Sequence, residues 1–193
     1  MIHDPKNAIS DWQAALQYLK EGNRRFLENR LMPRFTNAQD RETLKSGQKP
    51  FAVIVTCSDS RCSPEIYFDQ KLGDIFVVRN AGNIVDTAAL GSIEYAALHL
   101  GVPLIVVVGH TCCGAVMAAC AAADGHPHSL QVVVDSIRKI TKGTDDLDKA
   151  INANVNGAVS TIKNDEIVKE AAVQVLGACY DIETGEVSWL TNK

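Results

Sequence analysis

Four short, continuous apolar runs constrain the fold of this chain more than any other feature of its sequence. They are rich in β-branched residues and occupy Phe51–Thr56, Ile75–Val78, Leu104–Val108 and Ala172–Ala178. Apolar residues that continue without polar alternation are typical of strands buried on both faces, as in a parallel sheet covered by helices. The segments between the runs have helical patterns, which would supply the crossovers that parallel strands need. The sequence therefore predicts an α/β fold with a mainly parallel central β-sheet flanked by helices.

Helical patterns account for much of the remaining chain. We predict helices at Thr87–Leu100, Ala115–Ala123, Ser129–Ile140 and Leu147–Ile162. Residues 180–190 instead indicate a strand, a glycine turn and a C-terminal antiparallel edge strand.

The N-terminal residues are more polar than the rest and predict a helical arm. One short helix of this arm is expected from about Thr36 to Leu44. The apolar stripe of the arm is thin, which indicates packing on another surface, such as a second subunit. We therefore expect one domain over residues 1–193, made of a helical arm at 1–47 and an α/β core at 48–193.

The composition argues against several classes of protein. The chain has 193 residues, and its 19 basic and 23 acidic residues create no cationic field for nucleic acid or an anionic membrane. No apolar run approaches the roughly 20 residues that span a bilayer. The N-terminus also lacks the basic start and apolar stretch of a signal peptide. We expect a cytoplasmic protein, in which the six cysteines are metal ligands, nucleophiles or core residues before they are disulfides.

Reactive side chains follow the first and third apolar runs. Cys57, Asp59 and Arg61 come after the first run, and His110 and Cys113 come after the third. The carboxyl ends of parallel strands share one edge of a sheet, where ligands of open α/β folds bind. Two thiolates and an imidazole have the softness that zinc prefers, and three protein ligands with one open position are typical of catalytic zinc. The sequence therefore predicts a zinc site on Cys57, His110 and Cys113.

Other interpretations of these residues stay open at this point. Free cysteines are often simply buried, and a cysteine with a histidine can act as a nucleophile without metal. Asp59 could ligate the metal or accept a hydrogen bond from its water while Arg61 holds it, or the two could form a plain surface ion pair. Cys62, Cys120 and Cys179 are expected to be packing residues, and Cys112 is not expected to bind zinc.

Three motifs in this order resemble the β-class carbonic anhydrases. They are Cys57-x-Asp59-x-Arg61, Arg79-Asn80-Ala81-Gly82-Asn83 and Gly109-His110-x-x-Cys113-Gly114. The resemblance is strong from about Gln48 to Ala119. It implies reversible hydration of CO₂ to bicarbonate and a proton by a zinc-bound hydroxide, with Zn²⁺ on the three predicted ligands. It also implies that Asp59 and Arg61 are the catalytic pair.

The resemblance extends to substrate binding and assembly. Gln48, Phe76 and Tyr95 match substrate-pocket residues of plant-type members, and the N–H of Gly114 would face the bound anion. In this family the active site lies at a dimer interface. The resemblance therefore implies a homo-oligomer, either a dimer or a dimer of dimers, with the N-terminal arm wrapped around the partner.

The sequence departs at one position from the pattern of a subgroup of this family. A bicarbonate-inhibited subgroup uses a Trp, an Arg and a Tyr; Arg79 and Tyr180 could match two of them, but Ile54 stands at the Trp position. We therefore expect a zinc that Asp59 does not cap. The rival functions are hydrolysis of carbon disulfide or carbonyl sulfide on the same scaffold and a non-catalytic module with a four-ligand zinc.

Overall fold

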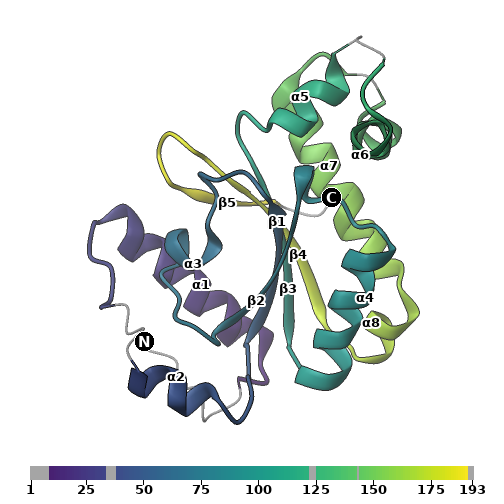
Figure 1. Ribbon diagram of the computed structural model, residues 1–193. Helices are drawn as coiled ribbons and strands as arrows, with labels where there is room; N and C mark the ends of the chain where they lie inside the picture. Colours follow the sequence, from purple (N-terminus) through teal and green to yellow (C-terminus); the bar gives the residue numbers. More distant parts are fainter. Residues whose placement is uncertain (1–8, 34–37, 122–124, 143, 191–193) are drawn as a thin grey trace.

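The computed structural model describes residues 9–33, 38–121, 125–142 and 144–190, and its centre is a five-stranded sheet (Figure 1). The strands stand in the order β2-β1-β3-β4-β5. Strands β1 to β4 are parallel, and β5 runs antiparallel to β4. Their bounds are β1 Ala52–Cys57, β2 Ile75–Asn80, β3 Leu104–His110, β4 Gln174–Tyr180 and β5 Val187–Leu190. The predicted α/β fold with a mainly parallel sheet and an antiparallel edge strand is confirmed.

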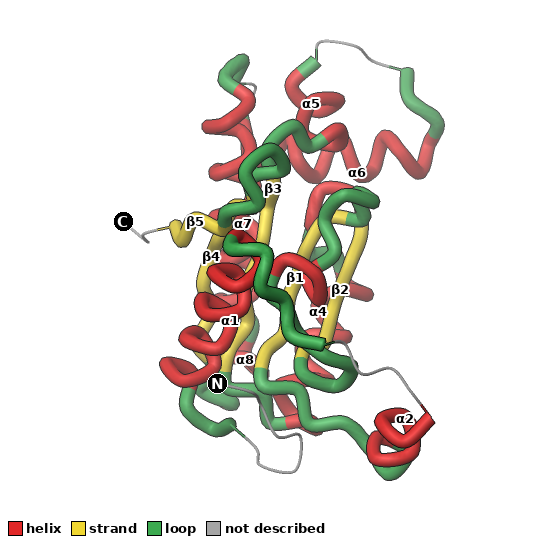
Figure 2. Tube along the Cα trace, turned by 90° about the vertical axis from the view of Figure 1, so that its left-hand side faces the viewer, coloured by secondary structure: helices red, strands yellow, loops and turns green. Residues whose placement is uncertain are grey.

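Helices cover both faces of this sheet. One face carries α1 and α3 and the other carries α4, α7 and α8, while α5 and α6 lie beyond one end (Figures 1 and 2). Their bounds are α1 Trp12–Leu27, α2 Ala38–Leu44, α3 Pro64–Tyr67, α4 Thr87–Tyr95, α5 Gly114–Cys120, α6 His128–Thr141, α7 Leu147–Asn164 and α8 Glu166–Glu170. The predicted helices all appear, and the short α3 and α8 are additional. Residues 36, 37 and 122 to 123 of the predicted helices lie outside the described residues.

The continuous apolar runs become strands because the sheet has a core on each side. Successive side chains of a strand point to opposite faces. Ile54 of β1 and Val106 of β3 join the cluster under α1, whereas Val53 and Ile105 join the cluster under α4 and α7. A third cluster, beneath α5 and α6, closes the carboxyl end of the sheet. This third cluster contains Cys57 and Cys113, two of the three predicted zinc ligands.

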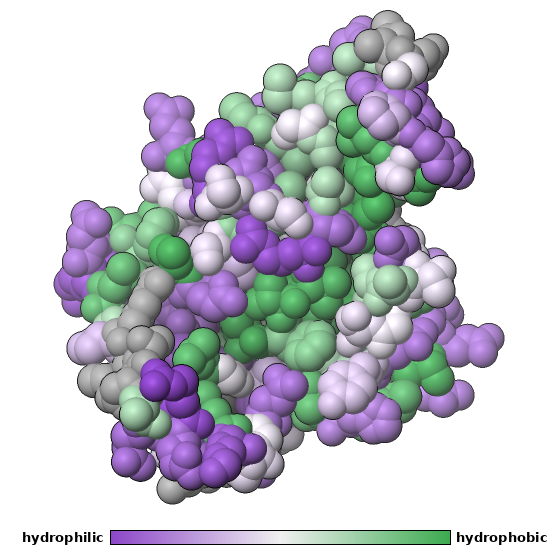
Figure 3. Space-filling model, in the orientation of Figure 1, coloured by the Kyte–Doolittle hydropathy of each residue, from purple (hydrophilic) through white to green (hydrophobic). Residues whose placement is uncertain are grey.

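Strand β2 differs from the prediction of burial on both faces. Most of its side chains are only half-buried, and Arg79 is exposed. The reason is topological, because β2 is the edge strand and has β1 as its only neighbour within the described part of the sheet. Apolar side chains therefore gather on the surface in the middle of the view, where Figure 1 places β2 (Figure 3).

Helix α1 of the N-terminal arm packs on the sheet of its own chain. Ala15 and Leu19 are fully buried in the cluster under α1. Asn23 bonds to the carbonyls of Tyr67 and Gly185 at 3.0 and 2.9 Å. Among the helices that the structure describes, α2 alone has no buried residue. No helix in the described part of the chain is long and apolar enough to cross a membrane.

Candidate metal centre and active site

Two adjacent strand ends bring Cys57, His110 and Cys113 together. Cys57 is the last residue of β1, His110 is the last residue of β3, and Cys113 caps the N-terminus of α5. Because β1 and β3 are paired and parallel, their carboxyl ends are neighbours. All three residues are buried, and their ligand atoms lie within 4.8 Å of one another. This metal cluster is the only group of this kind among the residues that the structure describes.

The cluster fits a tetrahedral zinc ion. Zinc–sulfur bonds of about 2.3 Å at a tetrahedral angle separate two sulfur atoms by about 3.8 Å, and Sγ of Cys57 lies 4.0 Å from Sγ of Cys113. Nδ1 of His110 lies 2.9 Å from the carbonyl oxygen of Thr111. A carbonyl only accepts, so Nδ1 carries the proton and Nε2 carries the free lone pair. Nε2 is buried without a hydrogen-bond partner, which is what a ligand nitrogen requires.

Cys57 has an environment that favours its thiolate. The adjacent Cys113 thiol does most to lower the pKa of Cys57, and the His110 ring and the N–H of Gly82 add to the effect. That N–H donates to Sγ of Cys57 over 3.3 Å. The thiolate is the form that binds metal, so the surroundings of Cys57 prepare it as a ligand.

Asp59 and Arg61 form a fork beside the metal cluster. Nε and Nη2 of Arg61 donate to the two carboxylate oxygens of Asp59 over 2.9 and 2.7 Å, and the backbone N–H of Arg61 adds a bond of 3.0 Å. The Arg61 guanidinium is the main reason why the pKa of Asp59 lies well below its usual range. Asp59 is absent from the ligand group, so the described residues supply three protein ligands rather than four.

Arg79 holds the segment that carries this fork. Its Nε donates to the carbonyl of Cys57 over 3.1 Å, and its Nη2 donates to the carbonyl of Asp59 over 2.8 Å. Tyr180 is buried and stacks on Tyr67 at a ring distance of 4.5 Å, and Ile54 is fully buried. The side chains at these three positions therefore make structural contacts. This agrees with the expectation, based on Ile54 at the Trp position, that the bicarbonate-inhibited pattern is incomplete here.

Gln48 lies far from the metal cluster within one chain. It precedes β1, whereas Cys57 ends that strand. The five steps from Ala52 to Cys57 alone span about 16 Å. Gln48 is exposed and lines a surface hollow with Arg41 and Leu44. The structure of one chain does not bring it to the other predicted site residues.

Phe76 and Tyr95 lie together but also away from the cluster. Their ring centroids are 6.3 Å apart. Phe76 lies on β2 opposite Val53, four positions before Asn80, which is the residue opposite Cys57. Tyr95 is 48% exposed. Gly114, in contrast, directly follows Cys113 and begins α5. Of the predicted substrate-binding residues, one chain brings only Gly114 to the metal cluster.

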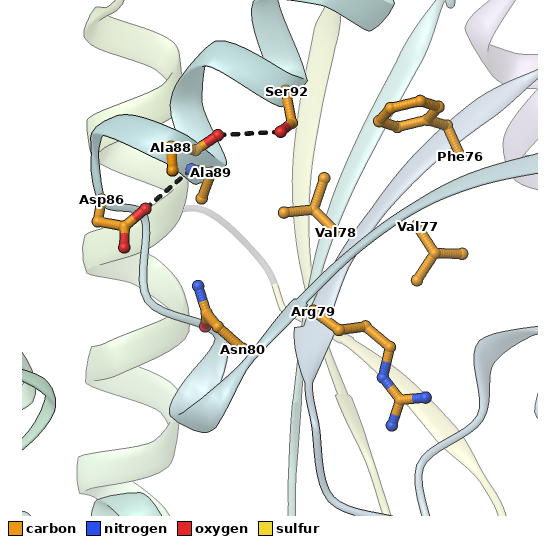
Figure 4. A pocket seen from close by; sticks show the side chains of 9 residues that line it. All are labelled: Phe76, Val77, Val78, Arg79, Asn80, Asp86, Ala88, Ala89 and Ser92. Carbon is orange, nitrogen blue, oxygen red and sulfur yellow. Dashed lines mark hydrogen bonds between the residues drawn. The ribbon is translucent and has the colours of Figure 1, made fainter. Parts of the chain in front are cut away.

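A hollow of about 360 Å³ separates β2 from the start of α4. Figure 4 shows Phe76 at one end and Asn80 with Asp86 at the other. Asp86 caps α4 by accepting from the N–H of Ala89 over 2.8 Å. Asn80 pairs with Cys57 across the sheet, so the hollow reaches the strand end that carries the cluster.

Two contacts beside the cluster were missed from sequence. One is the hydrogen bond from the N–H of Gly82 to Sγ of Cys57. The other is the hydrogen bond from the side-chain amide of Asn154, on α7, to the carbonyl of Gly82. The signal for Asn154 was a polar residue between Ile151 and Val155, inside an apolar helical stripe.

Comparisons with known proteins agree with this geometry. The carbonic anhydrase family model matches residues 52–187. Carbonic anhydrase 2 of Mycobacterium tuberculosis is 55% identical over 116 residues, which cover 60% of this chain and 54% of that protein. The match therefore spans about half the length of this curated relative. A carbonic anhydrase of Pseudomonas aeruginosa is 34% identical over 77% of both chains.

Solved structures give the same result. A tetrameric β-carbonic anhydrase from Sordaria macrospora superposes with a TM-score of 0.71 at 30% identity, over 80% of this chain and 87% of that one. The Coccomyxa β-carbonic anhydrase gives a TM-score of 0.73 at 28% identity, over 91% and 86%. The predicted resemblance is thereby confirmed, and the chain belongs to the carbonic anhydrase family, in its β class.

Proposed function

We propose that this protein is a zinc enzyme that reversibly hydrates CO₂ to bicarbonate and a proton. The observation that carries the proposal is the buried cluster of Cys57, His110 and Cys113, with a partnerless Nε2, beside the fork of Asp59 and Arg61. Family membership supports the same reaction.

Cys57, His110 and Cys113 would hold the zinc ion through two sulfur atoms and Nε2. When bound, zinc acts as a Lewis acid that makes water acidic enough to serve as a nucleophile, a role for which carbonic anhydrase is itself the standard example. The bond from Nδ1 of His110 to Thr111 fixes the ring so that Nε2 keeps its direction.

Asp59 would orient the attacking water. Its carboxylate stays ionised because Arg61 binds both oxygens, so it can accept a hydrogen bond from the nucleophile but cannot donate one. Accepting that hydrogen bond would turn an oxygen lone pair of the nucleophile toward the carbon of CO₂. Arg61 and Arg79 would act by holding Asp59 in place, and the N–H of Gly114 would face the anionic product.

A second copy of the chain would complete the substrate pocket. Gln48, Phe76 and Tyr95 lie away from the cluster of their own chain, and the edge strand β2 leaves apolar side chains half-exposed. The related protein from Sordaria macrospora is tetrameric. We therefore propose a homo-oligomer, a dimer or a dimer of dimers, in which these residues serve a neighbouring subunit.

The proposed location is the cytoplasm, which is supported by six cysteines that are all free. The proposed partners are CO₂ and bicarbonate, with no nucleic acid or membrane partner. None of the relatives named above is described as a carbon disulfide or carbonyl sulfide hydrolase. The three-ligand cluster likewise gives no support to a closed, four-ligand zinc module.

The test combines metal analysis with kinetics on the purified full chain. We expect close to one zinc per chain and rapid CO₂ hydration in a stopped-flow pH-indicator assay. Hydration that persists unchanged after a chelator has removed all zinc would contradict the proposal.

A further inference from the structure

A chain of two hydrogen bonds leads from helix α7 to the thiolate ligand on β1. Nδ2 of Asn154 donates to the carbonyl of Gly82 over 2.8 Å, and the N–H of Gly82 donates to Sγ of Cys57 over 3.3 Å. Asn154 is 1% exposed, and Gly82 is buried as well. The carbonyl of Gly82 only accepts, so the amide nitrogen of Asn154 must face it.

The turn that carries Gly82 is held in a demanding conformation. Gly82 has φ 71° and ψ 23°, and the following Asn83 also has a positive φ of 45°. A Cβ on Gly82 would lie 2.7 Å from Cδ1 of Ile137 and 3.1 Å from Cβ of Ala115. Only glycine fits both the backbone and the space, and a contact from outside the turn helps to keep this conformation.

The side chain of Asn154 does little to stabilise its own helix, α7. It lies in the apolar stripe of α7, where a buried amide is costly unless it is hydrogen-bonded. Its Oδ1 is buried without a partner, so the residue satisfies only part of its bonding capacity. The contact that it does make is directed at Gly82.

We propose that Asn154 is a positioning residue for the metal centre, because it fixes Gly82 so that the Gly82 N–H stays on the Cys57 thiolate. This inference rests on the proposed zinc function. An N–H on a thiolate is a charge-assisted hydrogen bond. It withdraws electron density from the sulfur and orients it, and through both effects it tunes the metal.

The experiment uses Asn154→Leu, which keeps the approximate volume and removes the donor. We expect zinc affinity, measured by competition with a chromophoric chelator, to fall about 10- to 100-fold. In the Co²⁺-loaded protein we also expect the sulfur-to-metal charge-transfer band to move, which a purely structural role would not cause. Asn154→Gln restores an amide donor and should recover part of both properties. Asn154→Ser, whose hydroxyl is one bond too short to replace the amide, is a second donor-loss variant if the leucine variant does not fold.

The matched control is Asn23→Leu. Asn23 is also a buried asparagine that bonds to backbone carbonyls, but it belongs to α1, which covers the opposite face of the sheet. This variant should lose stability and keep its zinc affinity and Co²⁺ spectrum. Unchanged affinity and spectrum in folded Asn154→Leu or Asn154→Ser overturn the proposal, and so does an equal loss in Asn23→Leu. Wild-type protein that binds zinc without hydrating CO₂ would overturn the proposed function alone, whereas wild-type protein that binds no zinc would overturn both.

Discussion

The sulfur atoms of Cys57 and Cys113 lie 4.0 Å apart although 56 positions separate these residues in the chain. The pairing of β1 with β3 closes that separation, because it places two strand ends side by side. The short distance suits two thiolates that share one zinc ion.

Replacing Cys57 by Ser should remove zinc and abolish CO₂ hydration, because a hydroxyl is a poor substitute for a thiolate ligand. Zinc content and stopped-flow rate are the measurements. Cys112→Ser is the control, since Cys112 adjoins the ligand Cys113 but is exposed. A zinc-free Cys57→Ser protein with full activity would rule out the assignment.

Asp59→Asn should keep zinc and lose the rate by about 100-fold or more. The amide presents one acceptor oxygen instead of two, and it can donate where the mechanism needs only acceptance. The control is Asp146→Asn, which disturbs a surface ion pair with Lys149. Retention of the wild-type kcat in Asp59→Asn would exclude an orienting role for this carboxylate.

The Asp59 carboxyl should also leave a signature in the pH dependence of stability. Arg61 holds its folded-state pKa below the unfolded value of about 4. A lowered pKa stabilises the folded state above pH 4, and this contribution is lost as the pH falls toward the folded-state pKa. The pair is partly exposed, so the expected effect is under about 1 kcal/mol.

Urea unfolding of wild type and Asp59→Asn, both stripped of metal by a chelator, provides the measurement. The difference in unfolding free energy should be constant between pH 5 and 7 and shrink below about pH 4. A difference that grows in acid would contradict the sign of the shift.

Gly82→Ala should destabilise the protein more than Gly101→Ala. Both glycines have a positive φ, of 71° and 64°, so each alanine should cost about 1–2 kcal/mol for the left-handed backbone. Only Gly82 also faces a clash, because nothing lies within 4 Å of a Cβ on Gly101. Thermal unfolding of both variants measures the difference, and equal losses would show that the space around Gly82 adapts.

Val77→Asp should dissociate the proposed homo-oligomer. Val77 lies on the edge strand, is half-buried, and is absent from the apolar clusters of its own chain. A charge at the edge of a sheet opposes association through that edge. The molar mass by light scattering should fall to that of one chain, whereas Val132→Asp, at an equally apolar position 54% exposed on α6, should leave the mass unchanged. An unchanged mass for Val77→Asp would place the interface elsewhere.

The sequence by itself determined the α/β fold, its strands and the identity of the three metal-binding candidates. These features depend on local patterns: unbroken apolar runs, helical periodicity, and soft ligands at two strand ends. The tertiary structure decided the features that depend on contacts between residues far apart in the sequence. Strand order made β2 an exposed edge despite its apolar run. Tertiary packing also set α1 against the sheet of its own chain, and it left Gln48, Phe76 and Tyr95 away from the metal cluster of that chain. The contact from Asn154 to Gly82 joins residues 72 positions apart, and such a bond exists only once helix and sheet have packed.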